Sequence, residues 1–376
     1  GQYNPQCDVI GPVTISNNMS YYGKNDSYGN DMYPDKMVSE ACKLADTEYD
    51  VDFTQYDNDN DGYVDFVFVI YAGYGEADGG AATTIWPHSW NLLAAGTRCQ
   101  VDGKTVDLYA CGNELDYYSK MHTGIGTFCH EFSHVLGLPD LYVTNKASHA
   151  TMNEWDIMDY GPYNNEGNTP PTFSAYERFF MGWLTPRLIT EPENVTLAEL
   201  NKSQEALLIS ETDQHNLIGN DPNPTTFYML ENRQQTGWDE YLPGHGLMLT
   251  KIQYSYSKWF NNTVNNNDKQ MGVDLIEAMD AAVDYGQASD LFPEGATKYL
   301  QIANHPIENI TEVNGIIHFK HQGGKDETDV ENVTNENAIH AIYNVLGQKQ
   351  TTIDVEQLPR GTYIVIDANG SMKIVR

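Results

Sequence analysis

Basic residues are scarce in this chain: 21 Lys and Arg stand against 53 Asp and Glu, a net charge of −32 over 376 residues. Such a negative protein repels phosphate backbones and anionic lipid surfaces, so neither nucleic acid nor an anionic membrane is expected as a partner. Long apolar runs are missing too, since no stretch approaches the roughly 18 apolar residues that a membrane span needs. No signal peptide is visible, so we expect the signal of an exported protein to have been removed already.

Cysteine is also sparse. Five cysteines cannot all pair with one another, so at least one thiol is expected to be free. Cys99 and Cys111 flank a predicted hairpin around residues 101–104, and their places suggest a pair. Cys129 directly precedes a histidine motif, but adjacent residues of a helix point about 100° apart, so we predict that it packs in the core.

The most informative motif is the run HEFSHVLGLPD at residues 130–140. His130 and His134 are spaced to lie on one face of a helix, where both imidazoles can meet a single cation. Glu131 lies between them and can serve as general base toward a water at the metal. Gly137 allows a sharp turn after the helix, and Asp140 then returns an oxygen ligand. Three protein ligands with one open position indicate a catalytic zinc site; the alternative is an amphipathic helix with two solvated or core histidines.

A second motif, WDIMDYG, follows at residues 155–161. A methionine before a polar turn and glycine, downstream of a long zinc motif, is typical of the Met-turn of metzincins. Met158 would then form an apolar floor under the ligands. Tyr160 is a candidate for holding the oxyanion of the tetrahedral intermediate, with simple packing against the site wall as the alternative.

A third motif, at residues 57–65, places acidic side chains at alternate positions, with glycine at the sixth. It resembles the first half of an EF-hand loop, although Phe68 stands where the bidentate glutamate belongs. We therefore predict a lone structural calcium loop that leads into a strand, with an acidic solvated turn as the alternative. Its expected ligands are Asp57, Asp59, Asp61, the Tyr63 carbonyl and Asp65.

Together, HEFSHVLGLPDLY, WDIMDYG, IWPHSW at residues 85–90, TFSAYERFFMGWL and ENRQQTGWDEYLPGHGLMLTKI at residues 231–252 resemble the immune inhibitor A-type zinc metallopeptidases. The resemblance implies that His130, His134 and Asp140 bind zinc and that Glu131 is the catalytic base. One departure is Lys251-Ile252-Gln253, where the family usually has His-Ile-Asp. The family also has an apolar strand and a helix upstream of residue 1, so the chain is expected to begin inside the catalytic domain. A separate N-terminal segment or propeptide is therefore a candidate partner.

The expected fold is an α/β metzincin-like catalytic domain with a β-rich extension and a small all-β C-terminal domain. Its four expected parts are an N-terminally incomplete catalytic domain (1–185), the β-rich extension of the peptidase (186–321), an acidic linker (322–338) and a C-terminal β domain (339–376). Within the first part we predict helices at 37–45, 123–136 and 173–184 and a central strand at 66–72. The motifs YNVLGQK and LPRGTYIV of the last part resemble the C-terminal sorting domain of the type IX secretion pathway in Bacteroidetes; an accessory β module is the alternative.

These features predict a secreted or cell-surface zinc endopeptidase that acts on proteins or peptides, with Zn²⁺ as catalytic and Ca²⁺ as structural ion. Three alternatives remain open: a zinc deacetylase or esterase, a catalytically inactive or truncated peptidase-like binding protein of the cell surface, and a calcium-stabilised adhesin.

Overall fold

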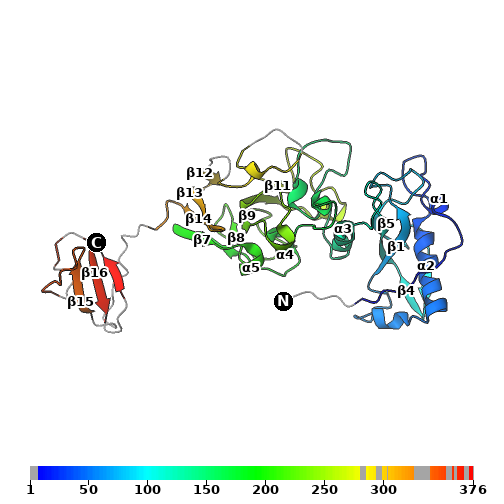
Figure 1. Cartoon of the computed structure of the whole chain (residues 1–376), viewed down its shortest axis with the longest axis horizontal. Coiled ribbons are helices and arrows are strands. Elements are labelled where there is room, and N and C mark those ends of the chain that lie inside the picture. The colour runs from blue at the N-terminus through cyan, green and yellow to red at the C-terminus, as the bar shows by residue number, and fades with distance from the viewer. Residues whose placement is uncertain are drawn as a thin grey trace.

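The computed structural model describes residues 7–279, 285–293, 299–302, 304–325, 339–352, 358–359, 362–367 and 372–375. It is a mixed α/β protein with several small sheets and few helices (Figure 1). Among the described residues, none of the helices has the length and apolar character needed to cross a membrane.

A small mixed sheet lies in the N-terminal part. Its strand β1 (Val67–Tyr74) runs parallel to β5 (Leu108–Leu115), which pairs on its other side with the antiparallel strand β2 (His88–Asn91). The prediction of a central strand at residues 66–72 is therefore wrong in its position, because β5 is the central strand. Burial gives the reason: five consecutive residues of β5 are buried, whereas Ile70 of β1 is 65% exposed. Among the described residues, no strand pairs with the outer edge of β1.

Helix α2 (Pro34–Tyr49) and the β3–β4 hairpin (Cys99–Val101 and Lys104–Val106) pack beside this sheet, after the short helix α1 (Met19–Tyr22). The helix is longer than the predicted 37–45, since a proline opens its first turn and Asp50 ends it in the left-handed conformation. The predicted hairpin is confirmed. The suggested pair of Cys99 with Cys111 is wrong: Cys99 lies beside Cys42 of α2, Cys111 faces His88, and all five thiols are free.

The helix that carries the histidine motif is α3 (Gly126–Val135), within the predicted 123–136, and α4 (Ala175–Phe180) lies within the predicted 173–184. Helix α4 begins with a capping box, in which Ser174 and Glu177 each satisfy a backbone N–H of the other. Short 3-10 turns follow α3 along the chain at Asn153–Trp155 and Gly161–Tyr163.

A five-stranded sheet forms the centre of the second half. Its order is β11 (Val273–Leu275), β10 (Gly246–Gln253), β9 (Thr226–Arg233), β8 (Leu207–Ile209) and β6 (Arg187–Leu188). Both faces of this sheet are buried, because successive side chains of a strand point to opposite faces and those of the central strands enter two different cores. In β9, Phe227 and Met229 join the core around Met158 and α4, while Leu230 joins a second core.

That second core lies against a four-stranded antiparallel sheet. It consists of β12 (Tyr299–Ile302), β13 (His305–Val313), β14 (Ile316–His321) and β7 (Glu193–Leu197). Buried aliphatic side chains of both sheets, such as Ile307 and Leu249, meet between them. Two short helices, α5 (Leu200–Ser203) and α6 (Tyr256–Phe260), interrupt the strands. The five-stranded sheet is therefore enclosed between the four-stranded sheet and the core of the histidine motif.

The last strands form a separate antiparallel sheet of β15 (Ile339–Asn344), β16 (Tyr363–Asp367) and β17 (Met372–Val375). Ile342, Tyr363 and Val365 are its described buried residues. Residues 326–338, most of the predicted linker, lie outside the described residues. The domain boundaries and the sorting role remain predictions.

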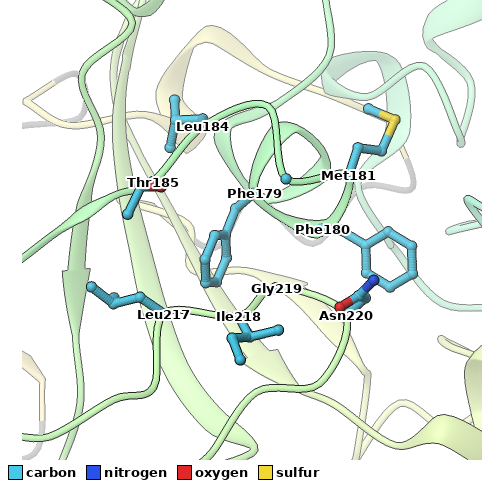
Figure 2. A pocket seen from close by; sticks show the side chains of 10 residues that line it. Phe179, Phe180, Met181, Leu184, Thr185, Leu217, Ile218, Gly219 and Asn220 are labelled. Atoms are coloured by element: carbon cyan, nitrogen blue, oxygen red, sulfur yellow. The ribbon is translucent and has the colours of Figure 1, made fainter. Parts of the chain in front are cut away.

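One cavity of about 190 Å³ lies between α4 and residues 217–220 (Figure 2). Its lining is mainly apolar, from Phe179, Phe180, Met181, Leu184, Leu217 and Ile218. None of the predicted metal ligands lines it, and it offers no titratable side chain for chemistry.

Candidate metal centre

Two glycines shape the chain on either side of α3. The helix approaches the loop after Met158 so closely that a Cβ on Gly126 would lie 1.9 Å from the Pro162 carbonyl oxygen. After the helix, Gly137 has φ +95°, a conformation that favours glycine, and this turn brings Asp140 back toward the helix. The close approach at Gly126 and the positive φ at Gly137 therefore each favour glycine, the first for lack of space and the second for backbone conformation.

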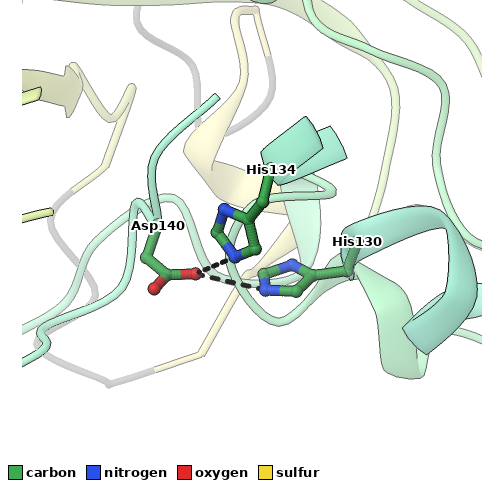
Figure 3. Close-up of side chains that lie close together, drawn as sticks. All are labelled: His130, His134 and Asp140. Carbon is green, nitrogen blue, oxygen red and sulfur yellow. Dashed lines mark ion pairs between the residues drawn. The ribbon is translucent and has the colours of Figure 1, made fainter. Parts of the chain in front are cut away.

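The structure brings the three predicted zinc ligands together (Figure 3). Asp140 Oδ1 lies 3.1 Å from His130 Nε2 and 3.2 Å from His134 Nε2. Each imidazole has its other nitrogen, Nδ1, 2.8 Å from a backbone carbonyl oxygen, that of Ile157 for His130 and that of Leu138 for His134. A carbonyl only accepts hydrogen bonds, so Nδ1 carries the proton in both rings.

The neutral rings therefore point lone pairs from Nε2 toward the carboxylate oxygen of Asp140. Three electron-rich atoms facing one point need a cation, which is either a proton or a metal ion. In the absence of metal, burial alone would lower the pKa of His130, but the Asp140 carboxylate raises it to about 9. Burial would raise the pKa of Asp140, and the two imidazoles instead hold it well below its usual range. Two neutral histidines and one carboxylate suit Zn²⁺, so the residues present fit that ion.

Glu131 lies on α3 between the two histidines and is only 6% exposed. Burial raises the pKa of its carboxyl group. A carboxylate that is poorly hydrated holds a proton more readily than one in water, which is the property required of a general base.

The segment predicted to be a Met-turn contacts the residues of the cluster. Met158 is fully buried, and its carbonyl oxygen accepts a hydrogen bond of 2.7 Å from the Leu141 N–H, next to Asp140. The preceding carbonyl, that of Ile157, is the partner of His130 Nδ1. The segment therefore contacts the chain at two of the three ligands, and Met158 packs in the core shared with the five-stranded sheet.

Tyr142 contacts the cluster and Tyr160 lies next to Tyr142, but the sequence singled out only Tyr160. Tyr142 stacks on His130 with ring centroids 6.2 Å apart, and burial together with the Asp140 carboxylate raises the pKa of its hydroxyl. Tyr160 is 51% exposed, and its ring lies 6.5 Å from that of Tyr142. Tyr142 stands two residues after Asp140, so its place beside the motif was the signal that could have found it.

Asn262 was also missed. Its side chain bonds to Asp140 from 122 residues further along the chain, and no local pattern marks it.

The predicted calcium loop has only part of its expected ligand set in one place. Carboxylate oxygens of Asp57, Asp59 and Asp61 lie within 4.8 Å of one another. Asp65 instead accepts hydrogen bonds from Asn58, and the amine of Lys104 lies 2.5 Å from Asp57. As predicted, the loop leads into a strand, β1, and not into a helix.

Comparison with known proteins relates this part of the sequence to a peptidase family. Residues 1–184 match the family described as immune inhibitor A peptidase M6, catalytic domain. The pre-pro-metalloprotease PrtV of Vibrio cholerae serotype O1 is 30% identical over 204 residues, which cover 48% of this chain and 22% of PrtV. Immune inhibitor A of Bacillus thuringiensis subsp. alesti is 29% identical over 206 residues, which cover 48% of this chain and 30% of that protein.

The aligned stretch is thus less than a third of either relative. The match over residues 1–184 includes α3, the three clustered residues predicted to bind zinc, and Met158. Residues 1–184, slightly less than half of this chain, are therefore similar to the catalytic domain of the immune inhibitor A M6 peptidases.

Proposed function

We propose that this protein is a zinc-dependent endopeptidase that hydrolyses protein substrates, with Glu131 as general base. The observation that carries the proposal is the convergence of His130 Nε2, His134 Nε2 and Asp140 Oδ1 beside a buried glutamate. A family match over the same residues supports it.

The residues of this chain have distinct parts in the reaction. Zinc held by His130, His134 and Asp140 supplies Lewis-acid polarisation of the scissile carbonyl and lowers the pKa of a water. Glu131 takes a proton from the attacking water and later passes it to the leaving amine nitrogen. Tyr160, which is half exposed and whose ring lies 6.5 Å from that of Tyr142, would donate its hydroxyl hydrogen to the oxygen that gains charge.

The Nδ1–H groups of both histidines stay bonded to backbone carbonyls during the cycle. These bonds fix the ring orientation and keep the imidazoles neutral when the ion is bound. Glu131, being almost fully buried, holds its proton away from bulk water between the two transfers.

We also propose that Asp57, Asp59 and Asp61 bind a structural Ca²⁺, with the Tyr63 carbonyl and Asp65 completing the set. Oxygen ligands at this spacing suit a hard cation, and clustering of three carboxylates in one turn is electrostatically unfavourable without one. The Lys104 amine supplies part of that compensation.

We place the protein outside the cytoplasm, secreted or at the cell surface. The strongly acidic composition and the C-terminal strands β15–β17, with their sorting-like motifs, support this location.

The test is cleavage of casein by the purified chain, with zinc content measured on the same sample and o-phenanthroline as inhibitor. The proposal predicts about one zinc per chain and inhibitor-sensitive cleavage. Zinc without cleavage of any unfolded protein would favour an inactive binding protein. Zinc with turnover of acetyl or ester substrates alone would favour a different hydrolase, and a chain free of zinc would favour the adhesin.

A further inference from the structure

Residues 262–266 (NTVNN), here called the asparagine segment, lie directly after α6 and beyond the part of the chain that matches the peptidase family. This segment packs on the loop that carries the third ligand. Asn262 makes two hydrogen bonds to Asp140: its Oδ1 accepts from the Asp140 N–H at 2.7 Å, and its Nδ2 donates to Asp140 Oδ2.

The rest of the segment holds the same loop. Asn265 is fully buried; its Nδ2 donates to the carbonyl oxygens of Leu141 and Val273, and its Oδ1 accepts from the Val273 N–H. Asn266 Oδ1 accepts from the Thr144 N–H at 2.7 Å. Because Val273 begins β11 of the five-stranded sheet, the ligand loop is tied to a rigid element of the second half of the chain.

Because of these hydrogen bonds, the two carboxylate oxygens of Asp140 have different partners. Oδ2 is occupied by the amide of Asn262, while Oδ1 faces both imidazole Nε2 atoms. If the carboxylate of Asp140 rotated about its Cβ–Cγ bond, Oδ2 would lose the hydrogen bond that it accepts from Asn262 Nδ2. Asn262 itself has φ +53°, a conformation that asparagine tolerates better than most residues.

We propose that Asn262 is a positioning residue of the metal centre, which presents Asp140 as a ligand through Oδ1 alone. The metal affinity of the N-terminal half then depends on a side chain from the second half. This inference rests on the proposed function, since it assumes that the cluster binds zinc. The competing explanation is that Asn262 only satisfies the Asp140 N–H and stabilises the loop.

The test measures the zinc dissociation constant of the full-length protein by competition with a chromogenic chelator, after metal removal. Asn262→Gly deletes the amide, suits the positive φ and keeps the main-chain carbonyl that accepts from Thr144 Oγ1. Asn261→Ala is the matched control, because Asn261 is exposed and bonds only to Ser257 among the described residues.

Loss of a partner behind a ligand typically weakens metal binding by about 10- to 100-fold, so we expect that change for Asn262→Gly and less than about threefold for Asn261→Ala. The thermal unfolding midpoint of the metal-free protein should be similar in all three proteins. A purely structural role predicts the reverse, a lower midpoint with unchanged zinc affinity, and would overturn the inference.

A crystal structure of the zinc-loaded wild type tests the same inference without a variant. It should show Asp140 bound through Oδ1 with Oδ2 still on Asn262; bidentate ligation with Asn262 turned away would overturn it. If the wild type binds no zinc, the proposed function fails together with this inference. If the wild type binds one zinc and Asn262→Gly binds it equally well, only this inference fails.

Discussion

Arg233 is a fully buried cation that contacts residues from both halves of the chain, and replacing it should destabilise the fold strongly. Its guanidinium is fully buried and lies 3.1 Å from Glu231 Oε1 and 2.9 Å from Asp239 Oδ1, with a hydrogen bond to the Thr172 carbonyl oxygen. Glu231 also accepts from the N–H of Ala175, the first residue of α4. The network therefore fixes α4 to strand β9.

Arg233→Met would leave two buried carboxylates without the guanidinium that forms an ion pair with each of them, and Arg178 would remain as the nearby positive charge. Asp239 keeps donors from Thr172 and Asn201, but Glu231 keeps only the Ala175 N–H among its described hydrogen bonds. Breaking a buried pair in this way costs about 3–5 kcal/mol. The exposed pair of Arg187 with Glu193 is the matched control: the Arg187 side chain is 54% exposed, so Arg187→Met should cost less than about 1 kcal/mol.

Urea unfolding followed by tryptophan fluorescence at pH 7 gives both free energies. Adding Glu231→Gln to Arg233→Met removes the uncompensated charge and should recover at least about 1 kcal/mol. The reasoning is refuted if Arg233→Met costs no more than Arg187→Met, or if the second substitution recovers nothing.

Three further predictions concern the site and its surroundings. Tyr160→Phe should lower kcat by about 100-fold or more with zinc content unchanged, as expected for loss of an oxyanion donor; an unchanged kcat would reduce Tyr160 to a wall residue. Burial raises the pKa of Asp159 to about 7 from 3.8, so the folded state retains a proton that the unfolded state releases, and stability falls as pH rises between these values. At pH 8, Asp159→Asn should therefore raise the free energy of unfolding, measured with urea, by up to about 4 kcal/mol, and at pH 4 it should leave that free energy unchanged. An equal gain at both pH values would contradict the view that the buried charge of Asp159 causes the effect. Adding Ca²⁺ to dialysed protein should raise the unfolding midpoint in wild type and much less in Asp59→Asn, and identical responses would contradict the calcium loop.

The clustering of the three predicted ligands could be inferred from the sequence because their geometry is local. Helical spacing places His130 and His134 on one face, and one glycine turn returns Asp140, so eleven residues of sequence determine most of the cluster. The predicted Met-turn follows within 20 residues of Asp140 and contacts the same loop.

What the sequence could not predict depends on contacts between distant segments. Asn262 reaches Asp140 across 122 residues, and an asparagine-rich run in a loop has no distinguishing pattern. The apolar strand β1 suggested a sheet centre, but its edge position depends on which strands pair, and the apolar composition of one strand does not reveal this. Cys99 lies beside Cys42 for a similar reason, since the packing of α2 on the hairpin, not the hairpin itself, decides its neighbour.

The most direct test of the central claim is a comparison of wild type with Glu131→Gln, measuring casein cleavage and zinc content on the same samples. The substitution keeps the size of a side chain that does not ligate the ion in the proposed mechanism and removes only the proton acceptor. The account predicts about one zinc per chain in both proteins and a loss of cleavage of at least about 100-fold in the variant. Cleavage that persists in Glu131→Gln, or a variant that has lost its zinc, would contradict the role assigned to Glu131.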